Sequence, residues 1–197
     1  MLIDFQKKYN LVPDGIFGPI TAKKITSVFK IKFPAQFFGQ VCHESLNLSL
    51  KEENLNYTAA RLQEVFPKYF PTYSKAKAYE RNPQKLANYV YGGRMGNDKL
   101  NDGYHFRGRG ALQLTGRDNY QAFENWLVSR GLCKKNEIMN NPDLVWKQFY
   151  IESAIFFFEK NNLWNITDIV RLTKKVNGGT NGLQDRINRT IKYEKWF

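Results

Sequence analysis

Apolar residues recur every three or four positions along most of this chain, which is the spacing of amphipathic helices. Residues that start or stop helices bound these segments. Pro34 opens one helix, Thr58 caps a second that ends at Pro67, and Asn82 begins a third that the glycine pair at 92–93 stops. Further helices are predicted over residues 118–130, 143–160, 167–176 and 182–195. We therefore predict a mostly helical fold with little or no β-sheet.

The first 32 residues form a much shorter predicted segment than the remainder of the chain. They predict a short helix ending near Tyr9, a turn at residues 13–15 and a second helix from about Thr21. Such a piece is too small to fold alone. We therefore divide the chain into a small helical segment, residues 1–32, and a larger domain, residues 33–197.

Composition excludes two broad classes of protein. Hydrophobic residues make up 42% of the chain and aromatic residues 15%, which rules out intrinsic disorder. No run of about 18 apolar residues occurs, so no transmembrane helix is expected. The start of the chain also lacks the order of a secretory signal. We expect a protein that stays in the cytoplasm until another protein opens the membrane.

The charge balance points to a polyanionic partner. The 30 Lys and Arg residues against 18 Asp and Glu residues give a net charge of +12, which suits nucleic acid, anionic lipid or anionic cell-wall polymer. Nucleic acid is disfavoured, because the Arg-Gly stretch at 107–110 is a single copy among apolar residues. With two His and two Cys residues, we expect no metal site and no cofactor.

Glu44 and Glu53 are candidates for acid–base chemistry. Glu44 lies on the edge of the apolar stripe of the helix that starts at Pro34, and burial would favour the protonated form that a general acid requires. A buried Glu paired with an arginine is the structural alternative. Glu53 follows in a polar stretch, as a general base or a solvated loop carboxylate. An inverting glycosidase separates such a pair by roughly 6.5–9.5 Å. If Glu44 and Glu53 meet in this way, the chain must bend near residues 47–49.

Residues 104–115 are the segment that favours an extended conformation. Glycines at 108 and 110 oppose a helix, and Leu112 alternates with Leu114 as in a short strand. In that conformation Gln113 and Thr115 would point to the same side. Their polar groups would then orient a water molecule or a sugar hydroxyl. A structural turn is the alternative.

Five motifs in order carry a resemblance to a known family. They are His-Glu-Ser at 43–45, Glu-Asn-Leu-Asn-Tyr at 53–57, Phe-Pro-Lys-Tyr-Phe at 66–70, Tyr-Gly-Gly-Arg-Met-Gly-Asn at 91–97 and the run 106–120 with Gly-Arg-Gly-Ala-Leu-Gln-Leu-Thr-Gly. Together they resemble the family 19 glycoside hydrolases, and within them the phage endolysins. The resemblance covers residues 33–195. It implies a lysozyme-like, two-lobed helical domain with a central cleft and an inverting reaction.

The resemblance also implies roles for individual residues. Glu44 resembles the general acid, Glu53 the general base and Thr115 the residue that helps to hold the attacking water. The residues that would bind the sugars are Tyr91, Gln113, Asn119, Asn177 and Arg186. The chain departs from the plant chitinases of the family, because Asn181 stands where a Glu is often found and the disulfide cysteines are absent.

The segment 1–32 resembles half of the helical peptidoglycan-binding module of wall hydrolases, through Phe-Gln-Lys-Lys-Tyr at 5–9 and Asp-Gly-Ile-Phe-Gly-Pro-Ile-Thr at 14–21. The expected function is therefore that of a monomeric muramidase, a lysozyme-type enzyme that cuts peptidoglycan for host cell lysis after a holin opens the membrane. A chitinase and a non-catalytic sugar-binding protein remain as alternatives.

Overall fold

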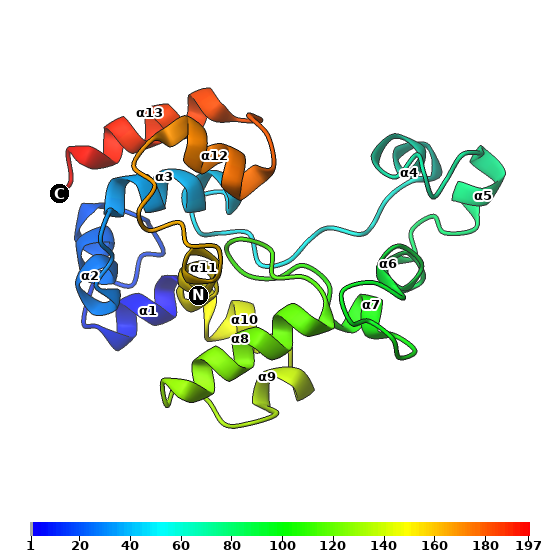
Figure 1. Ribbon diagram of the computed structural model, residues 1–197, viewed down its shortest axis with the longest axis horizontal. Helices are drawn as coiled ribbons and strands as arrows, with labels where there is room; N and C mark the ends of the chain where they lie inside the picture. Colours follow the sequence, from blue (N-terminus) through cyan, green and yellow to red (C-terminus); the bar gives the residue numbers. More distant parts are fainter. Residues whose placement is uncertain (1) are drawn as a thin grey trace. The chain divides into compact units, whose positions relative to one another are not determined.

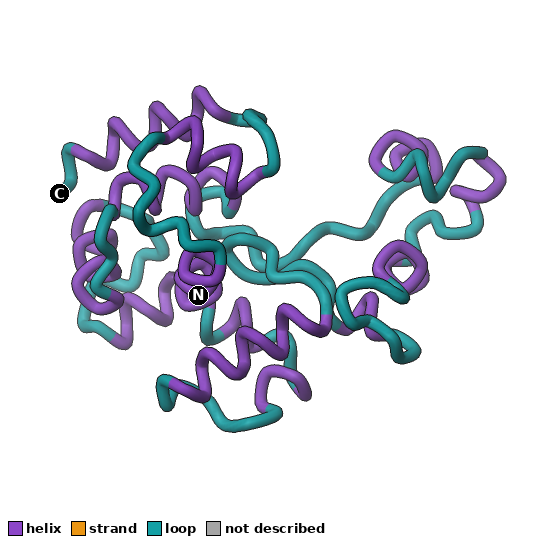
Figure 2. Tube along the Cα trace, in the orientation of Figure 1, coloured by secondary structure: helices purple, strands orange, loops and turns teal. Residues whose placement is uncertain are grey.

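Helices make up most of the computed structural model, which describes residues 2–197. The described residues form thirteen helices and two isolated β-bridges, Glu52 with Arg109 and Arg109 with Leu114. Figure 2 shows these helices joined by loops. The prediction of a mostly helical fold is confirmed. No helix within residues 2–197 combines the length and the apolarity needed to cross a membrane.

The chain divides into two compact units, and α10 (Leu144–Lys147) lies across their boundary. The first unit comprises the residues up to Lys51, Gly110–Leu112 and Trp146–Phe197; the second comprises Glu52–Arg109 and Gln113–Val145. The helices of the first unit are α1 (Leu2–Lys8), α2 (Pro19–Phe29), α3 (Pro34–Glu44), α11 (Tyr150–Lys160), α12 (Ile169–Asn177) and α13 (Leu183–Glu194). Those of the second are α4 (Ala59–Val65), α5 (Tyr73–Lys77), α6 (Pro83–Tyr91), α7 (Asp102–His105), α8 (Arg117–Ser129) and α9 (Glu137–Asn140).

The first unit is built around α3, which Pro34 starts as predicted. The Phe37 ring is fully buried and contacts the Phe158 ring at a centroid distance of 4.9 Å. Helix α13 lies along α3 (Figure 1). Gly39 permits this close approach, because a Cβ atom there would collide with the Thr190 hydroxyl. The end of α3 is therefore held against α13.

The amino-terminal segment packs onto the same helices. Phe17 contacts the rings of Phe38 and Tyr193 at 4.9 and 5.7 Å. Within the segment, buried Gln6 donates to the Asp14 carboxylate at 2.8 Å and to the Thr21 hydroxyl at 3.2 Å. These contacts join the segment to the first unit. The boundary at residues 32/33 stays a prediction.

The second unit has a core between α4 and α6, where Leu62 and Leu86 are fully buried. The side chains of Thr58 and Asn82 cap these two helices as predicted, accepting hydrogen bonds from the backbone N–H groups of Arg61 and Lys85. Farther along, buried Glu124 of α8 accepts from the backbone N–H groups of three residues around α9: Asn136, Ile138 and Met139. That carboxylate shapes the loop that follows α8.

Two predicted elements differ in the structure. The helix expected over 143–160 is interrupted at buried Phe149, which stands between α10 and α11 in the sequence and leaves helical geometry at φ −112°, ψ 35°. The segment 104–115 begins inside α7 and continues as turns instead of a strand. Gly110 and Gln113 have φ values of 79° and 50° in this segment, which are incompatible with a regular strand.

Candidate active site

Glu44 is the last residue of α3, and the chain turns sharply after it. Leu46, Asn47 and Leu48 all have positive φ, at 49°, 58° and 65°. The Ser45 hydroxyl supports this turn, because it donates to the Val41 carbonyl at 2.6 Å and accepts from the backbone N–H of Leu48 at 3.0 Å. The bend expected at residues 47–49 is thus present one residue earlier.

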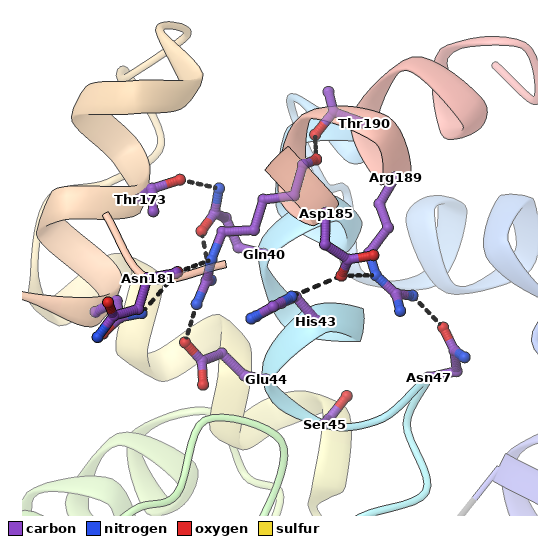
Figure 3. Close-up of polar contacts among 12 residues, drawn as sticks. Gln40, His43, Glu44, Ser45, Asn47, Thr173, Asn181, Asp185, Arg189 and Thr190 are labelled. Atoms are coloured by element: carbon purple, nitrogen blue, oxygen red, sulfur yellow. Dashed lines mark hydrogen bonds and ion pairs between the residues drawn. The ribbon is translucent and has the colours of Figure 1, made fainter. Parts of the chain in front are cut away.

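The Glu44 carboxylate contacts a buried cation. Arg186 of α13 is fully buried, and its Nη2 donates to Oε1 of Glu44. Its Nη1 donates to Oε1 of Gln40 at 2.8 Å, and Gln40 in turn donates to the Thr173 hydroxyl at 3.1 Å. Figure 3 shows this network at the end of α3. The arginine pairing that was one sequence-based alternative for Glu44 is therefore present.

The burial predicted for Glu44 is incomplete, since 32% of its side chain is exposed. Arg186, in contrast, is fully buried. Its side chain has no exposed surface, and its guanidinium contacts Glu44, Gln40 and the Asn181 carbonyl. The role predicted for Arg186 in sugar binding stays a prediction.

A second network lies beside the first on the same two helices. His43 Nδ1 lies 2.6 Å from Oδ2 of Asp185, and the same oxygen accepts from Arg189 Nε at 2.5 Å. Arg189 also donates to the side chain of Asn47 at 2.5 Å, as Figure 3 shows. These hydrogen bonds outweigh burial and lower the pKa of Asp185. Two consecutive residues of α13 therefore bind two consecutive residues of α3: Asp185 pairs with His43, and Arg186 with Glu44.

Asn177 ends α12, next to the predicted Asn-Gly-Gly turn. Its side chain donates to the Asn181 carbonyl at 3.0 Å, and Arg186 Nε donates to that oxygen at 3.4 Å. Gly178, at φ 76°, provides the left-handed residue that stops the helix. Asn177 therefore lies in the connection that leads to Arg186.

Glu53 lies in the second unit and is held by neutral donors. The backbone N–H of Gly108 donates to its Oε1 at 2.5 Å, and the Tyr91 hydroxyl donates to its Oε2 at 2.7 Å. The backbone N–H of Glu53 donates to the Gly108 carbonyl at 3.0 Å. Burial and the adjacent Glu53 charge raise the pKa of the Tyr91 hydroxyl above its usual range, which keeps it a donor.

Gly108 is the point on which several predicted residues converge. A Cβ atom there would lie 2.8 Å from Oε1 of Gln113, 3.2 Å from Oγ1 of Thr115 and 3.3 Å from Oε1 of Glu53. The Thr115 hydroxyl donates to the Gln113 carbonyl at 2.8 Å, and the Asn119 side chain donates to the Thr115 carbonyl at 2.8 Å. A turn, not the expected strand, brings these side chains together.

The structure thus gathers the predicted residues into two groups, one in each unit. The first contains Glu44, Asn177 and Arg186, and the second contains Glu53, Tyr91, Gln113, Thr115 and Asn119. Within each group, hydrogen bonds or close approach connect the members.

A pocket of about 330 Å³ adjoins Glu53 in the second unit. It is of a size that suits a small ligand, which typically needs about 300 Å³ or more. Its other lining residues are Glu52, Asn54, Leu55, Asn56, Pro83, Tyr104 and Arg107. The Arg107 guanidinium lies over the Tyr104 ring at 4.3 Å and pairs with Glu52 at 2.7 Å.

Several residues of both groups were missed by the sequence analysis. Gln40 precedes Glu44 by one helical turn on α3, so helical spacing was a usable signal. Asn54 and Asn56 lie in a motif that was recognised but was interpreted only for Glu53. No comparable signal pointed to Asp185. Among residues 2–197, no three His, Cys, Asp or Glu side chains gather closely enough to hold a metal ion.

Comparison with known proteins identifies the family. No family model matches the chain. A protein of Haemophilus influenzae described as a glycosyl hydrolase family 19 domain-containing protein is 36% identical over 188 residues. That alignment covers 93% of this chain and 90% of the relative. The chain therefore belongs to glycosyl hydrolase family 19.

Proposed function

We propose that this protein is a cell-wall hydrolase that cleaves the β-1,4 bond between N-acetylmuramic acid and N-acetylglucosamine in peptidoglycan. The observation that carries the proposal is the contrast between its two glutamates. Glu44 is held by a buried arginine at the end of a helix, whereas Glu53 is held by a backbone amide and a tyrosine hydroxyl. Each carboxylate is thus held in position by its own donors, and the motif resemblance gives Glu44 the role of acid and Glu53 that of base.

In the proposed reaction, Glu44 donates its proton to the glycosidic oxygen as the bond from the anomeric carbon to that oxygen breaks. Arg186 then stabilises the carboxylate that remains. Glu53 accepts a proton from the water molecule that attacks the anomeric carbon from the opposite side, and the configuration inverts. The hydroxyl of Thr115, which lies next to Gly108, helps to orient this water molecule.

Peptidoglycan is preferred to chitin as the substrate because of charge. The net charge of +12 favours an anionic polymer, and peptidoglycan carries carboxylates whereas chitin is neutral. The resemblance of residues 1–32 to half of a peptidoglycan-binding module supports the same choice. We further propose that the protein acts as a monomeric phage endolysin, and that a holin gives it access to the wall.

Product analysis tests the proposed reaction. Purified peptidoglycan and chitin oligomers are incubated separately with the wild type and with Glu44→Gln, and the products are identified by mass spectrometry. We expect muropeptides with N-acetylmuramic acid at the reducing end, released by the wild type alone. Products from chitin alone would identify a chitinase. Unchanged sugar binding without any product would identify a binding protein.

A further inference from the structure

A cluster of tyrosine rings covers one side of the core of the second unit. The Tyr79 and Tyr89 rings lie 4.9 Å apart, and Tyr69 meets Tyr89 edge to face at 5.7 Å. Buried Phe70 contacts both Tyr79 and Tyr89 from beneath, at 5.2 and 5.7 Å. Tyr89 retains 36% of its surface exposed to solvent. The rings therefore form a supported aromatic surface.

Each of these three tyrosines has a cation beside it. Lys85 Nζ lies 4.6 Å from the centre of the Tyr79 ring, and Lys75 Nζ lies 5.0 Å from that of Tyr89. Arg94 Nη1 donates to the Tyr69 hydroxyl at 2.7 Å. All three cations are on exposed residues. We call this surface, formed by Tyr69, Tyr79, Tyr89, Lys75, Lys85 and Arg94, the tyrosine–lysine face.

The cations of this face have no carboxylate partner among residues 2–197. The two glutamates of the surrounding segment are already engaged. Glu80 accepts from Lys77 at 2.5 Å and from the backbone N–H of Ala59 at 3.0 Å, and Glu64 accepts from Arg61 at 2.6 Å. Lys85 Nζ also donates to the Ala78 carbonyl at 2.8 Å, which leaves its charge unneutralised. The positive charge of the face therefore attracts anions from solution.

The tyrosine rings of the face are separate from the group around Glu53, although the charge of Arg94 also acts on the Tyr91 hydroxyl. Tyr89 and Tyr91 are two residues apart on α6, so their side chains diverge by roughly 200° around the helix. Tyr91 donates to Glu53, whereas Tyr89 packs against Tyr69 and Tyr79. A ligand on the tyrosine–lysine face would thus contact a different side of α6 from the side that holds Glu53.

We propose that the tyrosine–lysine face is a second binding site for peptidoglycan, distinct from the site of cleavage. Sugar rings pack against exposed Tyr89 and the half-buried rings beside it, and the carboxylates of the stem peptides pair with Lys75, Lys85 and Arg94. This inference rests on the proposed function for the choice of polymer. Peptidoglycan matches both features, because it repeats sugar rings and negative charges along one strand. The face would keep the enzyme on the polymer between cleavage events.

Binding to insoluble peptidoglycan tests this site. Lys75→Gln/Lys85→Gln is compared with Lys134→Gln/Lys135→Gln, which removes the same charge from two exposed lysines of the same unit. Both pairs are made in the Glu44→Gln background so that the polymer stays intact, and co-sedimentation gives the dissociation constant. We expect the 75/85 pair to weaken binding about tenfold at low salt and the 134/135 pair less than about twofold.

A chemically modified polymer identifies the groups that are bound. Peptidoglycan whose carboxyl groups have been converted to amides is expected to bind both variant pairs equally. Equal losses for the two pairs on untreated peptidoglycan would overturn the proposal, as would a 75/85 effect that persists on the amidated polymer. Binding of a single-stranded DNA oligonucleotide that the 75/85 pair weakens, with no effect of that pair on peptidoglycan binding, would assign the face to nucleic acid and overturn the proposal as well.

The outcomes separate this inference from the proposed function. Hydrolysis of peptidoglycan by the protein with wild-type Glu44 is measured from its products, independently of binding. If the protein cleaves peptidoglycan but its binding does not depend on Lys75 and Lys85, the second site is refuted and the proposed function stands. If binding depends on the two lysines but no cleavage is detected, the proposed hydrolase function is refuted and the face remains a peptidoglycan-binding surface.

Discussion

Glu44 and Glu53 are held in place by opposite means in the two units. Glu44 ends a helix, and a fully buried arginine from another helix pairs with it. Glu53 lies on a segment without regular structure, and uncharged donors from Gly108 and Tyr91 occupy its two oxygens. A charged partner couples Glu44 to the stability of its unit, because a buried cation without a partner is costly. Because the partners of Glu53 are neutral, losing one of them should affect the position of its carboxylate more than the stability of the unit.

Removing each carboxylate in turn gives the largest expected effect. Glu44→Gln and Glu53→Gln should each lower the rate of peptidoglycan hydrolysis by roughly 10²–10⁴-fold. One carboxyl group must donate a proton and the other must accept one, so the amide that replaces either cannot do its work. Initial rates of product release measure both losses. Glu64→Gln, an exposed pair of Arg61, is the control and should keep the wild-type rate.

Removing Arg186, the charged partner of Glu44, should lower the free energy of unfolding more than any other substitution in this comparison. Arg186→Met leaves Glu44 and buried Gln40 without their donor, so we expect the free energy of unfolding to fall by about 3 kcal/mol. Arg189→Met, on the same helix with 24% of its side chain exposed, should cost less than about 1 kcal/mol. Urea denaturation measures both. Equal losses would mean that burial of the arginine is irrelevant.

Glu152 on α11 adds a third carboxyl group to the comparison, and burial is the main influence on its pKa. Burial raises its pKa to about 7, opposed only in part by its own backbone amide and the charge of Lys8. A raised pKa stabilises the fold at low pH, and this contribution is lost as pH rises through about 7. Relative to Glu152→Gln, the unfolding free energy of the wild type should therefore fall by on the order of 2 kcal/mol between pH 5 and 8. Denaturation at several pH values tests this; parallel curves for both proteins would contradict it.

The neutral partner of Glu53 should give the smallest effect. Tyr91→Phe removes one hydroxyl donor and leaves the Gly108 amide in place, so we expect about a tenfold lower kcat, which corresponds to roughly 1.4 kcal/mol. Tyr89→Phe removes a hydroxyl from the other side of α6 and should leave kcat on a soluble oligosaccharide unchanged. A loss as large as that of Glu53→Gln would show that Tyr91 does more than hold the carboxylate.

Local signals predicted the parts of this structure that depend on neighbouring residues. Pro34, Thr58 and Asn82 start helices through their own backbone restriction or side-chain hydrogen bonds, so the start of each helix was visible in the sequence. The turn at Gln113 was not, because positive φ is uncommon for a residue with a Gln side chain. The interruption at Phe149 was not visible either, because the helix propensity of Phe does not mark it as a break.

Contacts between distant residues were beyond local signals. Glu44 was identified through its position on an apolar helix, but its partner Arg186 lies 142 residues later. The many arginines of the chain made such a pair plausible without specifying which arginine forms it. The convergence of Gln113, Thr115 and Glu53 on Gly108 likewise depends on how separate segments meet. Motif resemblance named these residues, and the structure supplied the contacts.

The pairing of Glu44 with Arg186 also orders events during synthesis. Glu44 emerges early from the ribosome, whereas α13, which contributes Arg186, is translated last of the helices described. Until α13 docks along α3, Glu44 has no buried cation beside it, and the apolar face of α3 lacks part of its cover. A nascent chain that ends before α13 therefore has an incomplete first unit. Such a protein would acquire its Glu44 environment only after translation of α13, which delays activity until nearly all of this sequence has been made.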